Sequence, residues 1–272
     1  MAPLTMSPQV FSILSGLVTE RTGLHFDIAH AAIFGEKVGT RATEAGFESL
    51  LDYYYFLRYD ADGLREMNAL AEALVVGETY LFRELAALEM MVDQILVPLS
   101  RSGCRPRVWC AACATGEEPH TLAMLLASRG LLDDVDLVAS DISAAALERA
   151  RSGRFSRRSL RQEIPDFASI LLDVDQRTVT ARPHLTRAID WRQVNLIDDA
   201  GVAAMGMFDV VLCRNVLIYF SDATVRGVID RLSARLKPDG ALFIGVSESL
   251  LRLGTPLLCE EKKGVFLYRK AT

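Results

Sequence analysis

The chain has 272 residues, of which 50% are hydrophobic and 24% are charged, and its net charge is −5. This profile is that of a soluble globular protein, and the length predicts one large domain or two small ones. The negative net charge argues against indiscriminate nucleic-acid binding, and no stretch approaches the roughly 20 apolar residues of a membrane helix. The N-terminal MAPLTMSPQV also lacks the basic and apolar regions of a signal peptide.

Helical patterns dominate residues 7–100. The first pattern places Val10, Leu14 and Val18 on one face and Gly23 where a helix would end. Later apolar patterns cover 47–57, 64–74 and 85–99. Between the last two lies VGETYLFRE, residues 76–84, which is denser in polar and aromatic residues than a connector needs. We therefore expect a helical N-terminal domain over 1–100, with a linker at 100–106.

From Arg107 onward, strand patterns alternate with helical ones. The predicted strands cover 108–113, 137–140, 189–194, 208–213 and 241–246, and a terminal hairpin covers 257–268. Ser143 is a good N-cap for a helix to about Ser152, and a second helix is expected over 222–236. Residues 237–240 read as a turn and 174–180 as a small hairpin. Strands separated by helices predict an α/β fold with a mostly parallel, doubly wound sheet over 101–272.

Polar residues follow the ends of these strands, where such sheets bind ligands. The set is Glu117, Glu118, Asp141, Asn195, Arg214 and Asn215. The small residues from Ala114 to Gly116 would let a ligand approach the backbone, and they precede the two glutamates. A carboxylate pair at that turn argues against a bound pyrophosphate and favours a ligand with hydroxyls or a positive charge.

Asp141 lies 25 residues after Gly116, at the end of the second predicted strand. An acidic residue in this position typically accepts hydrogen bonds from both ribose hydroxyls of an adenosine cofactor. The alternative is that it caps the helix beginning near Ser143. The sequence has neither a three-glycine dinucleotide fingerprint nor a Walker loop, so hydride and phosphoryl transfer become less favoured.

Four segments resemble the CheR-type chemoreceptor methyltransferases. They read CAACATGEEPHTLAMLL, VASDISAAALERARSGRFS, FDVVLCRNVLIYF and RLKPDGALFIGVSESL, and ERTGL near residue 20 and VGETYLFRE at 76–84 fit as well. The resemblance covers nearly the whole chain. It implies a Rossmann-like class I methyltransferase fold, S-adenosyl-L-methionine as cofactor with S-adenosylhomocysteine as product, and the transfer of methyl groups to receptor glutamates in the cytoplasm.

The resemblance also implies roles for individual residues. Thr79 and Arg83 would reach over the cofactor, with Glu118 and the neighbouring Glu117 at its amino-acid end. Asp141 would hold the ribose, and Asn195 and Leu196 would flank the adenine. Arg214, Asn215 and Tyr219 would line the methyl-transfer pocket. The catalytic candidates are Arg83, which would orient a carboxylate, and Tyr219, which would steer the substrate oxygen or pack on the cofactor. The structural alternatives are a surface salt bridge from Arg83 to Glu84 and a Tyr219 that merely ends its loop.

The partner implied by the resemblance is the cytoplasmic helical domain of methyl-accepting chemoreceptors. A small subdomain is expected over about 160–188, where some members bind a tethering peptide through a glycine-containing hairpin loop. LLDVDQRTVTARPH has no glycine, so we expect no dependence on a receptor tether. The arginines at 151, 154, 157, 158 and 161 form either a solvated face or a contact surface for an acidic receptor helix.

Other chemistries are less favoured. The five cysteines include a CxxC at Cys110 and Cys113, but it falls in a strand and its turn rather than at a helix N-terminus. The four histidines show no metal-ligand spacing, and no metal site is expected. Two alternatives remain open, namely a methyltransferase for another carboxylate acceptor and a cofactor-binding regulatory module without turnover.

Overall fold

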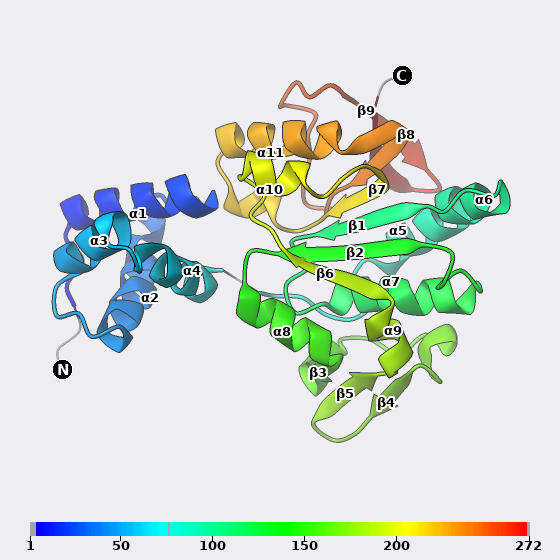
Figure 1. The fold of residues 1–272 in the computed structure, drawn as a ribbon, viewed down its shortest axis with the longest axis horizontal. Coiled ribbons are helices and arrows are strands. Elements are labelled where there is room, and N and C mark those ends of the chain that lie inside the picture. The colour runs from blue at the N-terminus through cyan, green and yellow to red at the C-terminus, as the bar shows by residue number, and fades with distance from the viewer. Residues whose placement is uncertain (1–3, 76, 271–272) are drawn as a thin grey trace. The chain divides into compact units, whose positions relative to one another are not determined.

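The computed structural model describes residues 4–75 and 77–270, so Val76 of the 76–84 motif lies outside the described residues. The chain divides into two compact units. One consists of Met1–Val76 with Tyr219–Val225, and the other of Gly77–Ile218 with Arg226–Thr272. We call them the helical unit and the sheet unit and describe each by itself (Figure 1).

The helical unit contains α1 (Pro8–Thr22), α2 (Ala31–Glu44), α3 (Leu50–Tyr59) and α4 (Gly63–Leu74). Ser7 caps α1 by accepting a hydrogen bond from the Val10 amide at 3.2 Å, and Gly23 ends it in the left-handed conformation with φ of 81°. The predicted helix end at Gly23 is thus confirmed. Leu14, Val18 and other apolar side chains of the four helices form one buried core.

A polar cluster is embedded in this helical core. Glu66 on α4 accepts two hydrogen bonds from Arg41 on α2, from Nε at 2.7 Å and from Nη2 at 2.6 Å. The hydroxyl of the fully buried Tyr53 donates a third at 2.8 Å. The Glu66 carboxylate therefore meets one guanidinium and one hydroxyl, and Nη1 of Arg41 also pairs with the exposed Glu44 at 3.4 Å.

The segment Tyr219–Val225 belongs to the helical unit although it is distant from it in sequence. Leu24 forms an antiparallel bridge with Phe220, and the His25 amide donates to the Tyr219 carbonyl at 2.9 Å. The expected division into 1–100 and 101–272 did not include this exchange of segments.

The sheet unit is built on seven strands in the order β6-β2-β1-β7-β8-β10-β9. Their bounds are β1 Arg107–Ala111, β2 Asp136–Asp141, β6 Ile189–Gln193, β7 Phe208–Cys213, β8 Leu236–Phe243, β9 Leu257–Lys262 and β10 Val265–Lys270. The first five strands in that order pair in parallel, whereas β10 pairs antiparallel with β8 and β9. The predicted mostly parallel sheet with a terminal hairpin is confirmed.

Helices cover both faces of this sheet, with α7 on one side and α10 and α11 on the other (Figure 1). The helices of the unit are α5 (Leu85–Met91), a π-helical turn (Val92–Leu96), α6 (Val97–Arg101), α7 (Glu117–Ser128), α8 (Ala144–Ser152), α9 (Pro183–Arg187), α10 (Asp199–Ala203) and α11 (Asp222–Ala234). Alternate strand residues such as Val108, Cys110, Val210 and Leu212 join α5 and α7 in one buried core.

Residues 77–101 belong to the sheet unit, whereas the sequence pattern placed a domain boundary near residue 100. The reason is packing, because Leu81, Phe82 and Met91 are almost completely buried in the same core as α7 and β1. The helical periodicity of 85–99 was read correctly, but periodicity does not tell which core a helix joins.

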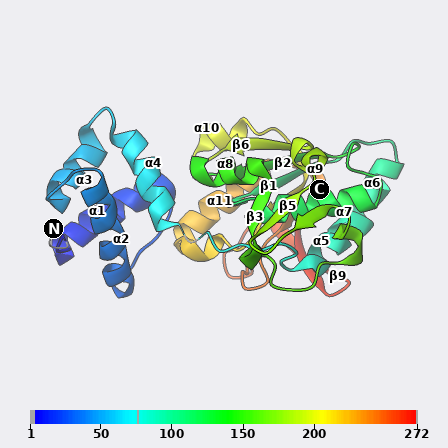
Figure 2. The ribbon, with the colours of Figure 1, turned by 90° about the horizontal axis from the view of Figure 1, so that it is seen from below.

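A second, three-stranded sheet has the order β3-β5-β4, with β3 Arg154–Ser156, β4 Leu172–Val174 and β5 Thr178–Ala181. It confirms the small hairpin expected at 174–180 and adds a third strand. Figures 1 and 2 place it on the α7 side of the main sheet. Asp175 closes the hairpin turn by accepting from the Arg177 amide, the Thr178 amide and the Thr178 hydroxyl. These hydrogen bonds, the hydroxyl's first, lower the pKa of Asp175 to about 2.

The turn expected at 237–240 is not a connection between elements, because it lies inside β8. Phe208 pairs with Leu236 and Val210 pairs with Ala241, so the intervening residues form a bulge in the ladder. Asp239 within the bulge has a φ of 60°. The turn predicted from the Pro-Asp-Gly signal is therefore wrong as a turn, because tertiary pairing continues the strand across it and leaves a bulge.

Candidate functional site

The predicted site residues follow the carboxyl ends of neighbouring parallel strands. Strand order reverses between β1 and β7, because β2 and β6 extend to one side of β1 while β7 and β8 extend to the other. In an open α/β sheet the crevice at such a reversal is the usual ligand site. Glu118 at the start of α7 and Arg214 directly after β7 face each other across this point.

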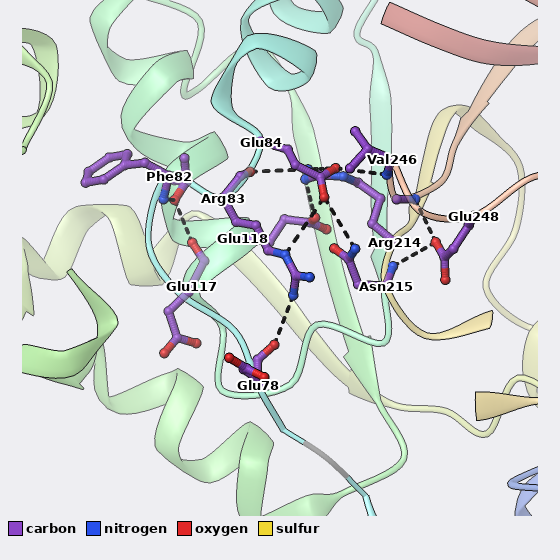
Figure 3. A network of polar contacts seen from close by, with 12 residues as sticks. Glu78, Phe82, Arg83, Glu84, Glu117, Glu118, Arg214, Asn215, Val246 and Glu248 are labelled. Atoms are coloured by element: carbon purple, nitrogen blue, oxygen red, sulfur yellow. Dashed lines mark hydrogen bonds and ion pairs between the residues drawn. The ribbon is translucent and has the colours of Figure 1, made fainter. Parts of the chain in front are cut away.

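Arg214 is the centre of a buried ion network (Figure 3). Its side chain is only 2% exposed, and it donates from Nη1 to Glu118 at 2.6 Å and from Nη2 to Glu84 at 2.8 Å. Asn215 extends the network, because its side-chain amide donates to Glu84 at 3.3 Å. Two carboxylates share this guanidinium, and Nε of Arg83 lies 3.9 Å from a carboxylate oxygen of Glu84.

The pKa directions follow from burial and from the shared arginine. Burial alone would raise the pKa of the Glu84 carboxyl, but attraction to Arg214 outweighs it and lowers that pKa. Burial raises the pKa of the Glu118 carboxyl above its usual value, with Arg214 opposing the shift. The Nε of Arg214 is buried and has no acceptor among the residues that the structure describes.

The turn into α7 is closed by Gly116, whose φ of 91° is left-handed. A Cβ added there would lie 2.7 Å from the Cβ of Ala150, so this position requires glycine. Glu117 is 3% exposed, and it accepts hydrogen bonds from the Thr115 hydroxyl at 2.7 Å and the Ser159 hydroxyl at 3.0 Å. Burial raises its pKa. This geometry gives Glu117 a role in holding the loop, and its contact with the cofactor stays a prediction.

Arg83 lies between the polar network and Glu78. Its Nη1 donates to the Glu78 carbonyl at 3.0 Å, and its Nε is 3.9 Å from a carboxylate oxygen of Glu84. The salt bridge to Glu84 that was the structural alternative is therefore present, at a long distance and partly buried. Tyr80 lies between two guanidiniums, with that of Arg83 5.5 Å and that of Arg161 4.6 Å from the ring centre. The side chain of Arg83 is 29% exposed, so it is accessible to a ligand.

Thr79 is half-buried, and no hydrogen bond of its side chain is found within the described ranges. Arg161 also pairs with Glu78 at 2.8 Å, and Arg151 donates to the Trp191 carbonyl at 3.2 Å. Two of the five arginines at 151–161 thus make contacts with other residues of the chain. Arg154, Arg157 and Arg158 are exposed.

Asp141 ends β2 and is 6% exposed. Its carboxylate accepts from the Ala114 amide at 2.8 Å and from the Ser143 amide at 2.9 Å. Ser143 in turn caps α8 by accepting from Ala146 at 2.9 Å, as expected. Asp141 therefore does take part in the start of α8. A carboxylate has about four acceptor positions, so ribose binding remains compatible with these contacts and stays a prediction.

The remaining predicted residues are distributed between the two units. Asn195 and the buried Leu196 follow β6, at the same edge of the sheet as Asp141. The carbonyl of the Asn195 side chain accepts from the Ile197 amide at 3.2 Å. Tyr219 belongs to the helical unit, where it packs against the core. The structure thus brings Glu118, Arg214 and Asn215 together, and the role of Tyr219 stays a prediction.

Left-handed backbone conformations concentrate in the loops of this site. Among non-glycine residues they occur at Phe82, Glu84, Ala112, Ala114 and Asn215, with φ from 46° to 66°. Such conformations are unfavourable for residues with a Cβ and persist only where surrounding contacts impose them. The loops are therefore held in fixed geometry by their hydrogen bonds.

Two residues of the network were not among the predicted site residues. Glu84 accepts hydrogen bonds from Arg214 and Asn215, and Glu248 accepts three from backbone amides. Figure 3 shows both glutamates beside Asn215. Both lie inside the quoted motifs VGETYLFRE and RLKPDGALFIGVSESL. The signal that could have identified them as site residues was a charged residue at or near the end of each motif.

Other chemistries find little support in the geometry. Burial raises the pKa of the Cys110 and Cys113 thiols well above the usual value, the opposite of a reactive thiolate. Over residues 4–75 and 77–270 no group of three or more metal-ligating side chains could hold a metal ion. Within the same ranges no helix has the length and apolar character needed to cross a bilayer.

Comparisons with known proteins agree with this geometry. The family model "CheR methyltransferase, SAM binding domain" matches residues 77–263. A chemotaxis protein methyltransferase 2 of Vibrio cholerae is 31% identical over 87% of this chain and 84% of its own length. Chemotaxis protein methyltransferase 1 of Pseudomonas aeruginosa is 33% identical over 77% of this chain and 79% of its own.

Two further comparisons concern a longer protein and a solved structure. A probable biofilm formation methyltransferase, WspC, of Pseudomonas putida is 34% identical over 86% of this chain and 56% of its own length. The solved N-methyltransferase NodS of Bradyrhizobium japonicum, in complex with S-adenosyl-L-homocysteine, has 14% identity and a TM-score of 0.42 over 87% of this chain and 99% of that one. With a family match over 77–263 and relatives above 30% identity, the chain belongs to the CheR methyltransferase family, whose cofactor is S-adenosylmethionine.

Proposed function

We propose that the protein transfers a methyl group from S-adenosylmethionine to glutamate side chains of chemoreceptors, giving glutamyl methyl esters and S-adenosylhomocysteine. The observation that carries the proposal is membership of the CheR family, with chemotaxis methyltransferases as relatives over most of the chain. The cytoplasmic helical domain of methyl-accepting chemoreceptors is the proposed partner.

The charge of the site fits such a cofactor. When bound, S-adenosylmethionine supplies an electrophilic methyl carbon on a positively charged sulfonium. The carboxylates of Glu84 and Glu118 would attract that cation and its amino group, while Arg214 and Arg83 offset part of their charge. The side-chain carbonyl of Asn215 accepts no hydrogen bond from the described residues, so it is free to accept one from the cofactor. Asp141 would hold the ribose, and Asn195 and Leu196 would contact the adenine.

The acceptor needs little chemical activation. A glutamate is ionised near neutral pH, so no general base is required, and catalysis consists mainly of alignment and partial desolvation. The carboxylates of Glu84 and Glu118 would repel an incoming carboxylate. Arg83 is therefore the proposed residue for orienting it, because its guanidinium is partly exposed and lies beside Glu84. Tyr219 is proposed to steer the substrate oxygen, and Thr79 to contact the cofactor.

We propose that no receptor tether is required. The hairpin turn between β4 and β5 is closed by Asp175 and contains no glycine, unlike the loop of tether-binding members. The exposed Arg154, Arg157 and Arg158 are proposed to contact an acidic receptor surface instead. Binding of an aromatic-rich receptor tail peptide with micromolar affinity would contradict the absence of a tether.

The test is transfer of labelled methyl from S-adenosylmethionine to membranes that contain the organism's own chemoreceptors. We expect base-labile label on a receptor-sized band, as a glutamyl ester requires. Arg83→Ala should abolish the label, whereas Arg252→Ala, a change of an exposed arginine outside the site, should leave it unchanged.

The opposite outcome is equally informative. Cofactor binding in a calorimeter together with no label on any receptor would refute the receptor assignment. A carboxylate acceptor of another kind, or a regulatory module that only binds the cofactor, would then be the better proposal.

A further inference from the structure

Glu248 holds two loops of the site together through a single carboxylate. It lies in the turn after β8, where its own amide donates to the Gly245 carbonyl at 2.9 Å. Its Oε2 accepts from the Asn215 amide at 2.8 Å and from the Gly245 amide at 2.6 Å, and its Oε1 accepts from the Leu217 amide at 2.8 Å. Figure 3 shows the carboxylate beside Asn215.

The three donors come from two different loops. Asn215 and Leu217 belong to the loop after β7, and Gly245 to the loop after the adjacent parallel strand β8. Hydrogen bonds from backbone amides to a carboxylate are charge-assisted and stronger than neutral ones. The carboxylate of Glu248 therefore fixes the separation of the two loops at the edge of the sheet where the predicted cofactor residues lie.

Asn215 is the residue most dependent on this arrangement. Its φ of 60° is left-handed, a conformation that a residue with a Cβ keeps only when its contacts impose it. The hydrogen bond from the Asn215 backbone amide to Glu248 favours this conformation on one side. The hydrogen bond from the Asn215 side chain to Glu84 favours it on the other. With both in place, the side-chain carbonyl of Asn215 keeps one direction.

Gly245 shows how closely these groups pack. A Cβ added there would lie 2.9 Å from Oε2 of Glu248 and 3.0 Å from Cγ of Asn215. The backbone of the β8 loop thus approaches both side chains, and only glycine allows that approach without moving them.

We propose that Glu248 is a positioning residue that sets cofactor affinity through Asn215. It acts on the backbone of the loop and not on the ligand. The inference rests on the proposed role of Asn215 at the cofactor, but not on which acceptor is methylated. It assigns a function to a residue that the sequence did not single out.

The test is a double-mutant cycle with calorimetric titration of S-adenosylhomocysteine. Glu248→Gln replaces one acceptor oxygen by a donor that faces backbone amides. We expect it to raise the dissociation constant about tenfold, as loss of charged hydrogen bonds would. Asn215→Ala should have a similar effect, and the double variant should be no weaker than Asn215→Ala alone, because one residue acts through the other. Glu261→Gln, a change of an exposed glutamate on β9, is the matched control and should bind as the unmodified protein does.

Two further measurements guard against a variant that is simply misfolded. Gly245→Ala keeps the charge of Glu248 but crowds both its carboxylate and the Asn215 side chain, and it should also raise the dissociation constant. Amide hydrogen exchange should show lost protection at Asn215, Leu217 and Gly245 in Glu248→Gln while the strands stay protected.

Three results would overturn the inference. The first is a dissociation constant of Glu248→Gln within twofold of the unmodified protein. The second is a double variant in which the increases in the dissociation constant caused by Glu248→Gln and by Asn215→Ala multiply. The third is an unchanged dissociation constant in Asn215→Ala. None of these measurements uses a methyl acceptor. A failed receptor assay would therefore refute the proposed function and leave the result of the cycle standing.

Discussion

Each unit of the protein contains an arginine bound to carboxylates, and the two arrangements differ in burial, because the side chain of Arg41 is 27% exposed and that of Arg214 only 2%. In the helical unit, Arg41 binds Glu66 through two hydrogen bonds, and Tyr53 donates a third. In the sheet unit, Arg214 is shared by Glu84 and Glu118, and its Nε lacks an acceptor among the described residues.

The difference indicates two uses of the same residue type. In the helical cluster each acceptor oxygen of Glu66 has a donor, and the partly exposed Arg41 also pairs with Glu44 at 3.4 Å, which suits a part that fixes how helices pack. The sheet network is closed off from solvent around Arg214 and lies at the strand reversal between β1 and β7. A buried donor without an acceptor, such as Nε of Arg214, is expected more often at a ligand crevice than in a purely structural cluster.

The largest expected effect comes from removing the shared cation. Arg214→Met leaves Glu84 and Glu118 buried without a counter-charge, and breaking such a buried pair costs about 3–5 kcal/mol. Both tryptophans, Trp109 and Trp191, lie in the sheet unit, so urea unfolding followed by tryptophan fluorescence reports on this unit. A loss below about 1 kcal/mol would show that the network does not depend on the arginine.

Acid should destabilise the sheet unit through His120. The imidazole is fully buried between the Gly116 carbonyl and the Thr186 hydroxyl, and burial lowers its pKa from 6.5 to about 4. The unfolded chain therefore binds the proton first as pH falls. The stabilisation is complete above pH 6.5 and decreases to about pH 4, by about 3 kcal/mol in total.

The measurement is the pH dependence of urea unfolding in the unmodified protein and in His120→Asn, since the difference between them isolates the histidine. The two histidines of the helical unit, His25 and His30, are exposed. Parallel curves for the two proteins would exclude His120 as the origin of the acid sensitivity.

A smaller effect on stability is expected in the helical unit, at the cluster of Arg41, Tyr53 and Glu66. Tyr53→Phe removes one of three donors to Glu66 but leaves both bonds from Arg41, so the loss should be about 1 kcal/mol. Scanning calorimetry would measure it, with Tyr55→Phe on an exposed tyrosine as control. Affinity for S-adenosylhomocysteine should not change. A weaker affinity would mean that this cluster is not purely structural.

The smallest effect separates the two neighbouring glutamates at the start of α7. Glu117→Gln keeps hydroxyl partners at Thr115 and Ser159 and removes a charge whose burial is unfavourable, so stability should change by less than about 1 kcal/mol. The dissociation constant of S-adenosylhomocysteine should stay within twofold. A large loss of affinity would instead support the predicted cofactor contact of Glu117.

Local signals in the sequence were sufficient for most of the fold. The run FDVVLC forms β7 with the expected bounds, Gly23 ends α1, and Ser143 caps α8, because each depends on neighbours within a few residues. The edge of the sheet where the site lies was also predictable, since the carboxyl ends of parallel strands meet there.

Long-range contacts decided what local signals could not. Residues 77–101 joined the sheet unit and Tyr219–Val225 the helical unit because of packing and strand bridging between distant segments. The turn at 237–240 became a bulge because β8 continues its pairing with β7 beyond it. Glu84 and Glu248 acquired their roles from partners more than 30 residues away.

The sequence by itself determined the family, the order in which the strands and their polar residues follow one another along the chain, and which residue types meet at the sheet edge. Only the tertiary structure decided that Arg214 is enclosed by two carboxylates, that Glu117 turns inward, and that Glu248 clamps two loops. The physical reason is that a residue's type fixes which bonds it can make, whereas burial and distance fix which of them it does make.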